Sequence, residues 1–230
     1  KALAREHGVA TLPEFVITHG EWSAGREDLL RAIAAFANEH TSTGALIGKP
    51  AAHGSSIGMK IAHTSADWAD AVDEALRFGD RAMLEPYLER ARELEVAVLE
   101  RSDGAVEAFG PGEVFPGHEF YDYDAKYAPG ISRTTTSSDL PPALAEEMRA
   151  AAVALFTAAQ SRGLSRMDFL MARSGERAGR WYLSEVNTFP GFTPISLFPA
   201  LVMSGGSSFI ELCVELVAAA AARPAPRSAR

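Results

Sequence analysis

Two short segments decide the fold of this chain: Ser165-Arg-Met-Asp-Phe-Leu-Met171 and Trp181-Tyr-Leu-Ser-Glu-Val-Asn187. Both are rich in apolar and aromatic residues, as strands are. The stretch between them, Ser174-Gly-Glu-Arg-Ala-Gly179, is polar and contains glycine, which is typical of a hairpin loop. The sequence therefore predicts a β-hairpin here.

A hairpin that is symmetric about this loop places Asp168 opposite Glu185 and Arg166 opposite Asn187. Because side chains alternate along a strand, these four residues then share one face of the sheet. Carboxylate and amide oxygens suit Mg²⁺ or Mn²⁺, and an arginine beside them suits a phosphoryl oxygen. A solvated face whose charges pair with one another is the alternative, and a shift of one residue would disperse the patch. The opposite face is expected to carry Met167, Phe169, Tyr182 and Val186.

The composition is that of an ordinary globular protein. The 230 residues are 47% hydrophobic and 23% charged, enough for one large domain or two small ones. A net charge of −8 argues against a nucleic-acid partner and an anionic membrane surface. The single Cys213 cannot form an internal disulfide, and its apolar neighbours predict a buried structural thiol. With neither a long apolar run nor a signal peptide visible, we expect a cytoplasmic protein. The chain does not begin with methionine, so an N-terminal part is expected to be missing.

Helical and strand patterns mix without a strict βαβ rhythm, which favours an α+β fold. A boundary is expected near Glu85, between a unit of residues 1–85 and a unit of residues 86–222, with a disordered tail at 223–230. The long segment 110–138 is expected to be irregular. The expected strands are 15–18, 45–49, 59–62, 81–85, 93–100 and 105–109, and the expected helices are 27–39, 64–78, 141–160, 197–203 and 208–222.

Lys49 ends a predicted strand just before a loop that contains Gly54-Ser-Ser-Ile-Gly58. Glycines allow close approach of the backbone, and consecutive N–H groups with hydroxyls can surround anionic oxygens. The loop is neither a Walker A sequence nor a dinucleotide fingerprint, and a flexible hairpin loop is the alternative. Glu85 likewise ends a buried strand whose following backbone groups could recognise an adenine.

The segment Phe120-Tyr-Asp-Tyr-Asp-Ala-Lys-Tyr127 lies within the long irregular stretch and is too aromatic for simple disorder. Lys126 could reach a phosphate, and Tyr127 could close over a small substrate. An aromatic plug that holds the loop to its own core is the alternative interpretation.

Taken together, these stretches resemble the D-alanine–D-alanine ligase family of the ATP-grasp superfamily. They occur in the family's order and cover nearly the whole chain. The matching segments are Lys49-Pro50 with Gly54-Ser-Ser-Ile-Gly58, Leu84-Glu85, Arg92-Glu-Leu-Glu-Val-Ala-Val98, Tyr121-Asp-Tyr-Asp-Ala-Lys-Tyr127, Arg166-Met-Asp168, Glu185-Val-Asn-Thr-Phe-Pro-Gly-Phe-Thr193 and Ser196-Leu197.

The resemblance implies an ATP-grasp fold in which two α+β subdomains hold ATP, with residues 1–85 as the lid and residues 86–222, including loop 110–138, as the catalytic core. It implies two Mg²⁺ ions, for which Mn²⁺ can substitute, held by Asp168, Glu185 and Asn187. The implied nucleotide contacts are Lys49, Gly54, Ser55, Ser56, Glu85, Pro86, Leu88, Glu93 and Lys126. The implied catalytic residues are Arg166, Lys126, Tyr127 and Ser55, and the implied substrate contacts are Tyr127, Arg166, Gly191, Ser196 and Leu197.

The activity that the resemblance implies is ATP-dependent ligation of two D-amino acids, D-alanine with D-alanine, through an acyl phosphate. Such a ligase serves peptidoglycan precursor synthesis, and through it the cell wall and cell shape. A related ligase with another acceptor, such as D-serine or an antibiotic-pathway amino acid, would show the same core motifs. A nucleotide-binding module without turnover is a third reading, and a homodimer is left open. The family's N-terminal domain is expected to be missing from the sequence given.

Overall fold

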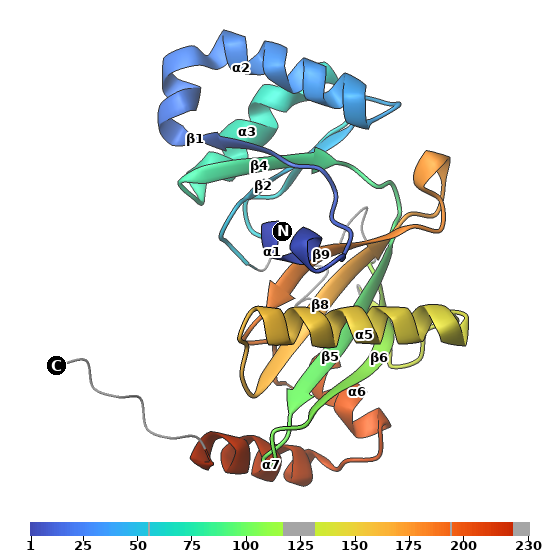
Figure 1. The fold of residues 1–230 in the computed structure, drawn as a ribbon. Helices are drawn as coiled ribbons and strands as arrows, with labels where there is room; N and C mark the ends of the chain where they lie inside the picture. The colour runs from blue at the N-terminus through green and yellow to red at the C-terminus, as the bar shows by residue number, and fades with distance from the viewer. Residues whose placement is uncertain (55, 117–131, 194, 223–230) are drawn as a thin grey trace, which may run out of the picture. The chain divides into compact units, whose positions relative to one another are not determined.

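A computed structural model describes residues 1–54, 56–116, 132–193 and 195–222 of the chain (Figure 1). The fold is α+β, as expected, with two sheets whose paired strands are antiparallel. The residues separate into two compact units. The β1–β4 unit contains Leu12–Arg90, and the β5–β9 unit contains Lys1–Thr11, Ala91–Phe115 and Thr134 to the last described residue. The boundary expected near Glu85 falls inside strand β4, and the predicted tail at 223–230 lies outside the described residues.

The β1–β4 unit is a four-stranded sheet with two helices on one face (Figure 1). Its strand order is β1-β4-β2-β3, so the second and fourth strands in sequence are neighbours. Side chains from helices and strands, including Ile17, Ile33, Leu46 and Leu84, are fully buried between the two layers. The elements are β1 (Phe15–Thr18), α2 (His19–His40), β2 (Leu46–Pro50), β3 (Lys60–Ala62), a 3₁₀ turn (Ser65–Asp67), α3 (Trp68–Arg77) and β4 (Arg81–Pro86).

Helix α2 begins well before the predicted residue 27. Thr18 and Glu21 form a reciprocal cap in which the Thr18 hydroxyl accepts the Glu21 N–H, and the Glu21 carboxylate accepts the Thr18 N–H. This cap satisfies two of the backbone groups that a helix start leaves open. Gly25 has non-helical dihedral angles and marks a kink, so the first turns do not share the period of the rest.

The β5–β9 unit is a five-stranded sheet of order β7-β6-β5-β8-β9. Helices α1 and α5 cover one face, where Leu94, Val96, Met167 and Phe169 form a buried core. Helix α6 contacts β5 and β6, and α7 follows it (Figure 1). The elements are α1 (Ala2–Glu6), β5 (Arg92–Glu100), β6 (Val106–Phe115), β7 (Arg133–Thr135), α5 (Pro142–Ala158), β8 (Leu164–Met171), a 3₁₀ turn (Gly175–Arg177), β9 (Trp181–Asn187), α6 (Leu197–Ser204) and α7 (Phe209–Ala221).

Strand β6 is longer than predicted, and the irregular segment therefore does not begin at Gly110. The strand continues to Phe115, with a shift in its pairing with β5 between Glu95 and Ala97. Glycine at position 112 allows close packing: a Cβ atom on Gly112 would lie 2.7 Å from the Thr135 carbonyl oxygen and 3.0 Å from Leu201. Residues 117–131 of the predicted irregular segment lie outside the described residues.

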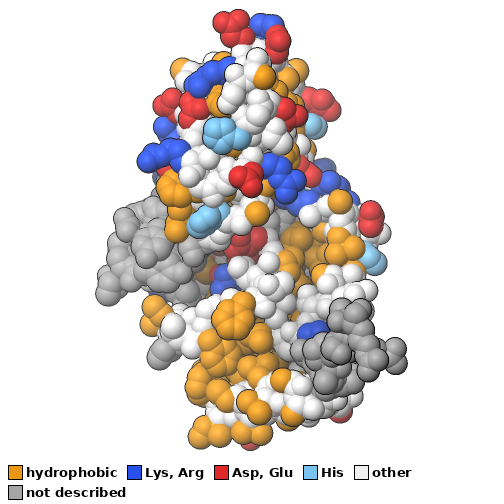
Figure 2. Space-filling view, turned by 90° about the vertical axis from the view of Figure 1, so that its left-hand side faces the viewer, with side chains coloured by type: hydrophobic (Ala, Val, Ile, Leu, Met, Phe, Trp, Pro, Cys, Tyr) orange, Lys and Arg blue, Asp and Glu red, His pale blue; other side chains and the backbone are white. Residues whose placement is uncertain are grey.

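Large hydrophobic side chains are exposed around α6 and α7 (Figure 2). Three of them, Ile210, Val214 and Val217, recur on one side of α7 and are 62–75% exposed. Cys213 is only partly buried, so its thiol is less buried than predicted. Among the described residues no single helix is long and apolar enough to cross a membrane; α6 and α7 pass that test only as a pair, which is bent by 102°.

Candidate active site

The predicted hairpin is present, and its polar pairs are the predicted ones. Arg166 lies opposite Asn187, and Asp168 lies opposite Glu185. Cross-strand partners in an antiparallel sheet project to the same face. The structure therefore confirms that the four side chains share one face of the β5–β9 sheet.

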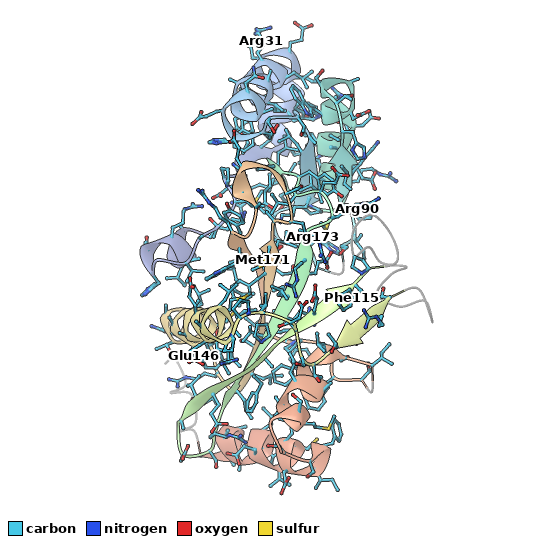
Figure 3. The ribbon with its side chains drawn as sticks, turned by 90° about the vertical axis from the view of Figure 1, so that its right-hand side faces the viewer. Arg31, Arg90, Phe115, Glu146, Met171 and Arg173 are labelled. Carbon is cyan, nitrogen blue, oxygen red and sulfur yellow. The ribbon has the colours of Figure 1, made fainter. Side chains whose placement is uncertain are left out.

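The hairpin is not symmetric about its loop, however. Between Asp168 and Phe169 the register shifts, so that Phe169 pairs with Leu183 and Ser184 is the extra residue of β9. Near the loop this shift moves Trp181 and Leu183 onto the core side, where the Trp181 ring packs edge-on against Phe169. The prediction that Tyr182 faces the core side is wrong, because Tyr182 pairs with Leu170, on the same face as Asp168. Met171, which is labelled in Figure 3, lies at the end of β8. It pairs with Trp181.

A continuous network links the polar side chains. Arg166 donates from Nε to Asp168 Oδ1 at 2.7 Å and from Nη2 to Asp168 Oδ2 at 2.8 Å, which is a bidentate contact. The Asn187 amide nitrogen lies 2.8 Å from Asp168 Oδ2 and 3.1 Å from Glu185 Oε1. The residues predicted as metal ligands and the predicted phosphoryl-binding arginine are thus in direct contact.

Glu95 belongs to the same network, although it is not among the predicted site residues. It is the β5 partner of Asp168, and its Oε2 lies 3.1 Å from Arg166 Nε. Glu95 as a whole is 5% exposed. The spacing of Glu93 and Glu95 predicts that both lie on one face of a strand, but only the pairing of β5 with β8 shows which residues they face.

The patch has more acid than base. Burial alone lowers the pKa of the Arg166 guanidinium, but the negative charges of Asp168, Glu95 and Glu185 together raise it above its ordinary value. Arg166 is therefore charged, and three carboxylates surround a single guanidinium. Opposite charges in such a partly buried setting attract more strongly than in bulk water, and the surplus of negative charge favours a cation.

Two carboxylates and one amide fit a magnesium ion. The nitrogen of the Asn187 amide, which carries its positive end, occupies the position between Asp168 and Glu185. The two ends of an amide exchange places by a simple rotation, which would direct the oxygen to the same point. Mg²⁺ is usually bound by one or two carboxylates together with phosphate oxygens and water. Among the described residues no three acidic, histidine or cysteine side chains lie close enough together to hold a metal ion by themselves.

The loop after β9 brings together two of the predicted substrate contacts. A Cβ atom on Gly191 would lie 2.8 Å from Ser196 Oγ, so only glycine fits there without displacing the serine. Ser196 Oγ also accepts the Thr193 N–H at 3.0 Å. Leu197 is different: it is 5% exposed and packs over Gly112, so its side chain is part of the fold.

In the β1–β4 unit, Lys49 and Glu85 form an ion pair of 2.6 Å between neighbouring strands. Glu85 is buried and Lys49 is largely buried. Gly54 and Ser56 lie in the loop after β2, where Ser56 adopts a left-handed backbone conformation (φ 56°). Such a conformation turns consecutive N–H groups toward one side. The β1–β4 unit thus offers its own cationic group beside a glycine-containing loop.

The remaining predicted residues are placed as follows. Pro86 ends β4 opposite Leu46, and Leu88 follows it, half-buried. Glu93 pairs with Leu170 and shares the face of Glu95. Ser55, Lys126 and Tyr127 lie outside the described residues.

Comparison with known proteins identifies relatives across this chain. The family model described as "D-ala D-ala ligase C-terminus" matches residues 3–218. The D-alanine–D-alanine ligase of Heliobacterium modesticaldum is 36% identical over 94% of this chain and 56% of its own length. That of Streptomyces coelicolor is 38% identical over 97% of this chain and 56% of its own length. The chain thus spans about half the length of these relatives.

Solved structures agree in fold. The D-alanyl-alanine synthetase A of Vibrio cholerae superposes with a TM-score of 0.78 at 30% identity, over 94% of this chain and 62% of that one. The D-alanine–D-alanine ligase of Coxiella burnetii gives a TM-score of 0.74 at 26% identity, over 96% of this chain and 55% of that one.

Proposed function

Because the chain belongs to the D-alanine–D-alanine ligase family and has its ATP-grasp fold, we propose that the protein containing it joins two D-amino acids at the expense of ATP. D-Alanine is the proposed donor and acceptor, and the dipeptide is a precursor of peptidoglycan. The observation that carries the proposal is the network of Arg166, Asp168, Glu185 and Asn187 on one face of the β5–β9 sheet.

The proposed chemistry needs no nucleophile from the enzyme. The carboxylate of the first amino acid attacks the γ-phosphorus of ATP, giving an acyl phosphate and ADP. The amine of the second amino acid then attacks the acyl carbon, and inorganic phosphate leaves as the amide forms. The protein supplies charge neutralisation and positioning, which are the main contributions to phosphoryl transfer.

In the β5–β9 unit, the proposed metal ligands, Arg166 and the loop after β9 have separate tasks. Asp168, Glu185 and Asn187 hold Mg²⁺, which when bound neutralises phosphate charge. Arg166 donates to the transferred phosphoryl group and then to the negative oxygen that develops as the amine attacks. Ser196 and Gly191 position the acceptor's carboxylate, with the Ser196 hydroxyl as hydrogen-bond donor.

We propose that the β1–β4 unit serves as the nucleotide lid. Lys49 donates to phosphate oxygens, and the backbone N–H groups of the Gly54–Gly58 loop add further donors. Glu85 with the backbone around Pro86 and Leu88 binds the adenine, and Glu93 binds the ribose. Lys126 is proposed to contact phosphate as well, and Ser55 and Tyr127 are proposed to join in closing the loop over the substrates.

The test is a panel of amino-acid pairs with the full-length protein, ATP and either Mg²⁺ or Mn²⁺. We expect ADP, phosphate and a dipeptide in equal amounts with D-alanine as both substrates, and much less product with L-amino acids. Turnover that requires D-serine or another amine as acceptor would assign the protein to a different ligase of the same family. Tight binding of Mg·ATP without turnover on any pair would contradict the proposal and indicate a nucleotide-binding module.

A further inference from the structure

We propose that Glu95 is a positioning residue: it holds the Arg166 guanidinium on the sheet while Asp168 binds the metal. The inference rests on the proposed function, which assigns Asp168 to Mg²⁺ and Arg166 to the phosphoryl group. The inference adds Glu95 to that site and explains why it lies beside Arg166.

The geometry gives Arg166 two anionic neighbours. Its Nε is 2.7 Å from Asp168 Oδ1 and 3.1 Å from Glu95 Oε2. Ala97 is the β5 partner of Arg166, and Glu95 is the partner of Asp168, so the two carboxylates lie side by side on adjacent strands. The guanidinium therefore has a second acid within ion-pair distance, on a different strand from the first.

A bound cation changes the demands on Asp168. Asp168 accepts two hydrogen bonds from Arg166 and one from Asn187. A divalent cation at the same oxygens competes for their lone pairs and repels the guanidinium. Arg166 then needs another acid to keep it on this face, and Glu95 already contacts it.

The surroundings restrict where the Glu95 carboxylate can lie. Its partner on β6 is Gly112, and the side chains of Leu197 and Leu201 fill the space over that glycine. This apolar packing disfavours a charged group on the β6 side. The Glu95 side chain is 7% exposed and lies beside Arg166, where its charge is poorly screened by water.

The same strand system contains a matched control. Glu113 is also buried, but it is opposite Leu94, on the core side of the sheet. It accepts from Arg92 Nε at 2.8 Å and from Arg92 Nη2 at 2.6 Å. Because Glu113 lies on the other face of the sheet from Arg166 and Asp168, its variant reports only the general cost of neutralising a buried glutamate.

The experiment is a double-mutant cycle in the full-length protein: Glu95→Gln, Arg166→Lys and both changes together, with Glu113→Gln as control. We expect Glu95→Gln to lower kcat about 10- to 100-fold, the range found when a residue supporting an active-site group is lost. KM for ATP and the affinity for Mn²⁺, measured by electron paramagnetic resonance, should change less than about twofold. Glu95→Asp, which keeps the charge, should recover part of the rate.

The cycle separates a positioning role from a structural one. If Glu95 acts through Arg166, the double variant is no slower than Arg166→Lys alone. Multiplicative losses, or an equal rate loss in Glu113→Gln, would overturn the inference. A large drop in Mn²⁺ affinity would also overturn it, because that result makes Glu95 a metal ligand.

A second readout needs no turnover. In urea unfolding of the metal-free protein, Glu95→Gln should shift the midpoint differently in the wild-type and Arg166→Lys backgrounds, because the two side chains are in contact. Equal shifts in both backgrounds contradict the inference even if the wild-type protein ligates no amino-acid pair. Absence of wild-type turnover alone would count against the proposed function and leave this coupling measurable.

Discussion

The two faces of the β5–β9 sheet differ completely, although the same strands form both. On β8, the adjacent residues Asp168 and Phe169 project to opposite sides: Asp168 into the polar network, and Phe169, 1% exposed, into the core beneath α5. On β5, Glu95 and Val96 are divided in the same way. We infer that the core face supplies stability and that the polar face supplies charge for a ligand.

The polar face is a poor source of stability, because its negative charges outnumber its positive ones. Three carboxylates surround one guanidinium, and removing such charges from water costs free energy that their mutual attraction offsets only in part. A bound cation, as proposed for this site, would correct the imbalance. We therefore expect core substitutions to lower stability and polar-face substitutions to lower activity. Two measurements test this contrast, and two more, on α7, give the size of effects outside both faces.

The largest expected effect on stability is that of Phe169→Ala. Removing a fully buried ring leaves a cavity, and such changes lower the free energy of unfolding by about 3–5 kcal/mol. Denaturant unfolding measures the loss. A loss below about 1 kcal/mol would show that the core face is not the main source of stability.

Asp168→Asn changes the residue next to Phe169, and it should lower activity with little effect on stability. Losing one electrostatic contact to a transition state typically costs about 10²–10³ in rate, so phosphate release in the presence of D-alanine should nearly disappear. Because the change relieves repulsion with Glu95 and Glu185, the metal-free free energy of unfolding should fall by less than about 1 kcal/mol, or rise. A variant that unfolds easily but turns over normally would reverse the comparison.

A smaller effect is expected at a charge outside both faces. The Ser208 backbone N–H and hydroxyl lower the pKa of Glu211, which caps α7. A lowered pKa means that the charged carboxylate stabilises the fold above its ordinary pKa, and that this contribution is lost as pH falls through the lowered value. Urea unfolding between about pH 6 and pH 3 should therefore show a shallower loss of stability for Glu211→Gln than for wild type. Identical slopes would exclude this cap as a source of acid sensitivity.

The smallest effect is expected on the exposed side of α7. Val214 is 62% exposed, so Val214→Thr removes almost no buried surface. Its free energy of unfolding should stay within about 0.5 kcal/mol of wild type. A clear loss would mean that this hydrophobic surface is covered in solution, and the oligomeric state should then be measured as a function of concentration.

The sequence predicted the local features of the site better than the long-range ones. The pairs Asp168–Glu185 and Arg166–Asn187 follow from one hairpin, whose strands are close in sequence. The contact of Glu95 with Arg166 depends on the pairing of β5 with β8, which no local pattern gives. The Lys49–Glu85 ion pair likewise requires β2 beside β4.

Element boundaries were missed for separate physical reasons. The irregular segment was predicted to begin at residue 110, yet close packing of α6 on Gly112 keeps β6 extended to Phe115. In α2, the capping box of Thr18 and Glu21 starts the helix before the apolar period becomes regular. The register shift in β9 did leave a signal in the sequence: Trp181 and Leu183 are apolar, whereas Glu185 and Asn187, at the same parity, are polar.

The extra residue Ser184 changes the side to which alternate residues of β9 project. Before it, Trp181 and Leu183 project into the core; after it, Glu185 and Asn187 project to the polar face. Trimming the 172–180 loop would leave that division intact, because the loop lies beyond the paired residues. Deleting Ser184 would instead rotate Glu185 and Asn187 toward Met167 and the α5 side. Any transplant of this hairpin onto another scaffold must therefore copy the length of β9 residue for residue, whereas its connecting loop is open to redesign.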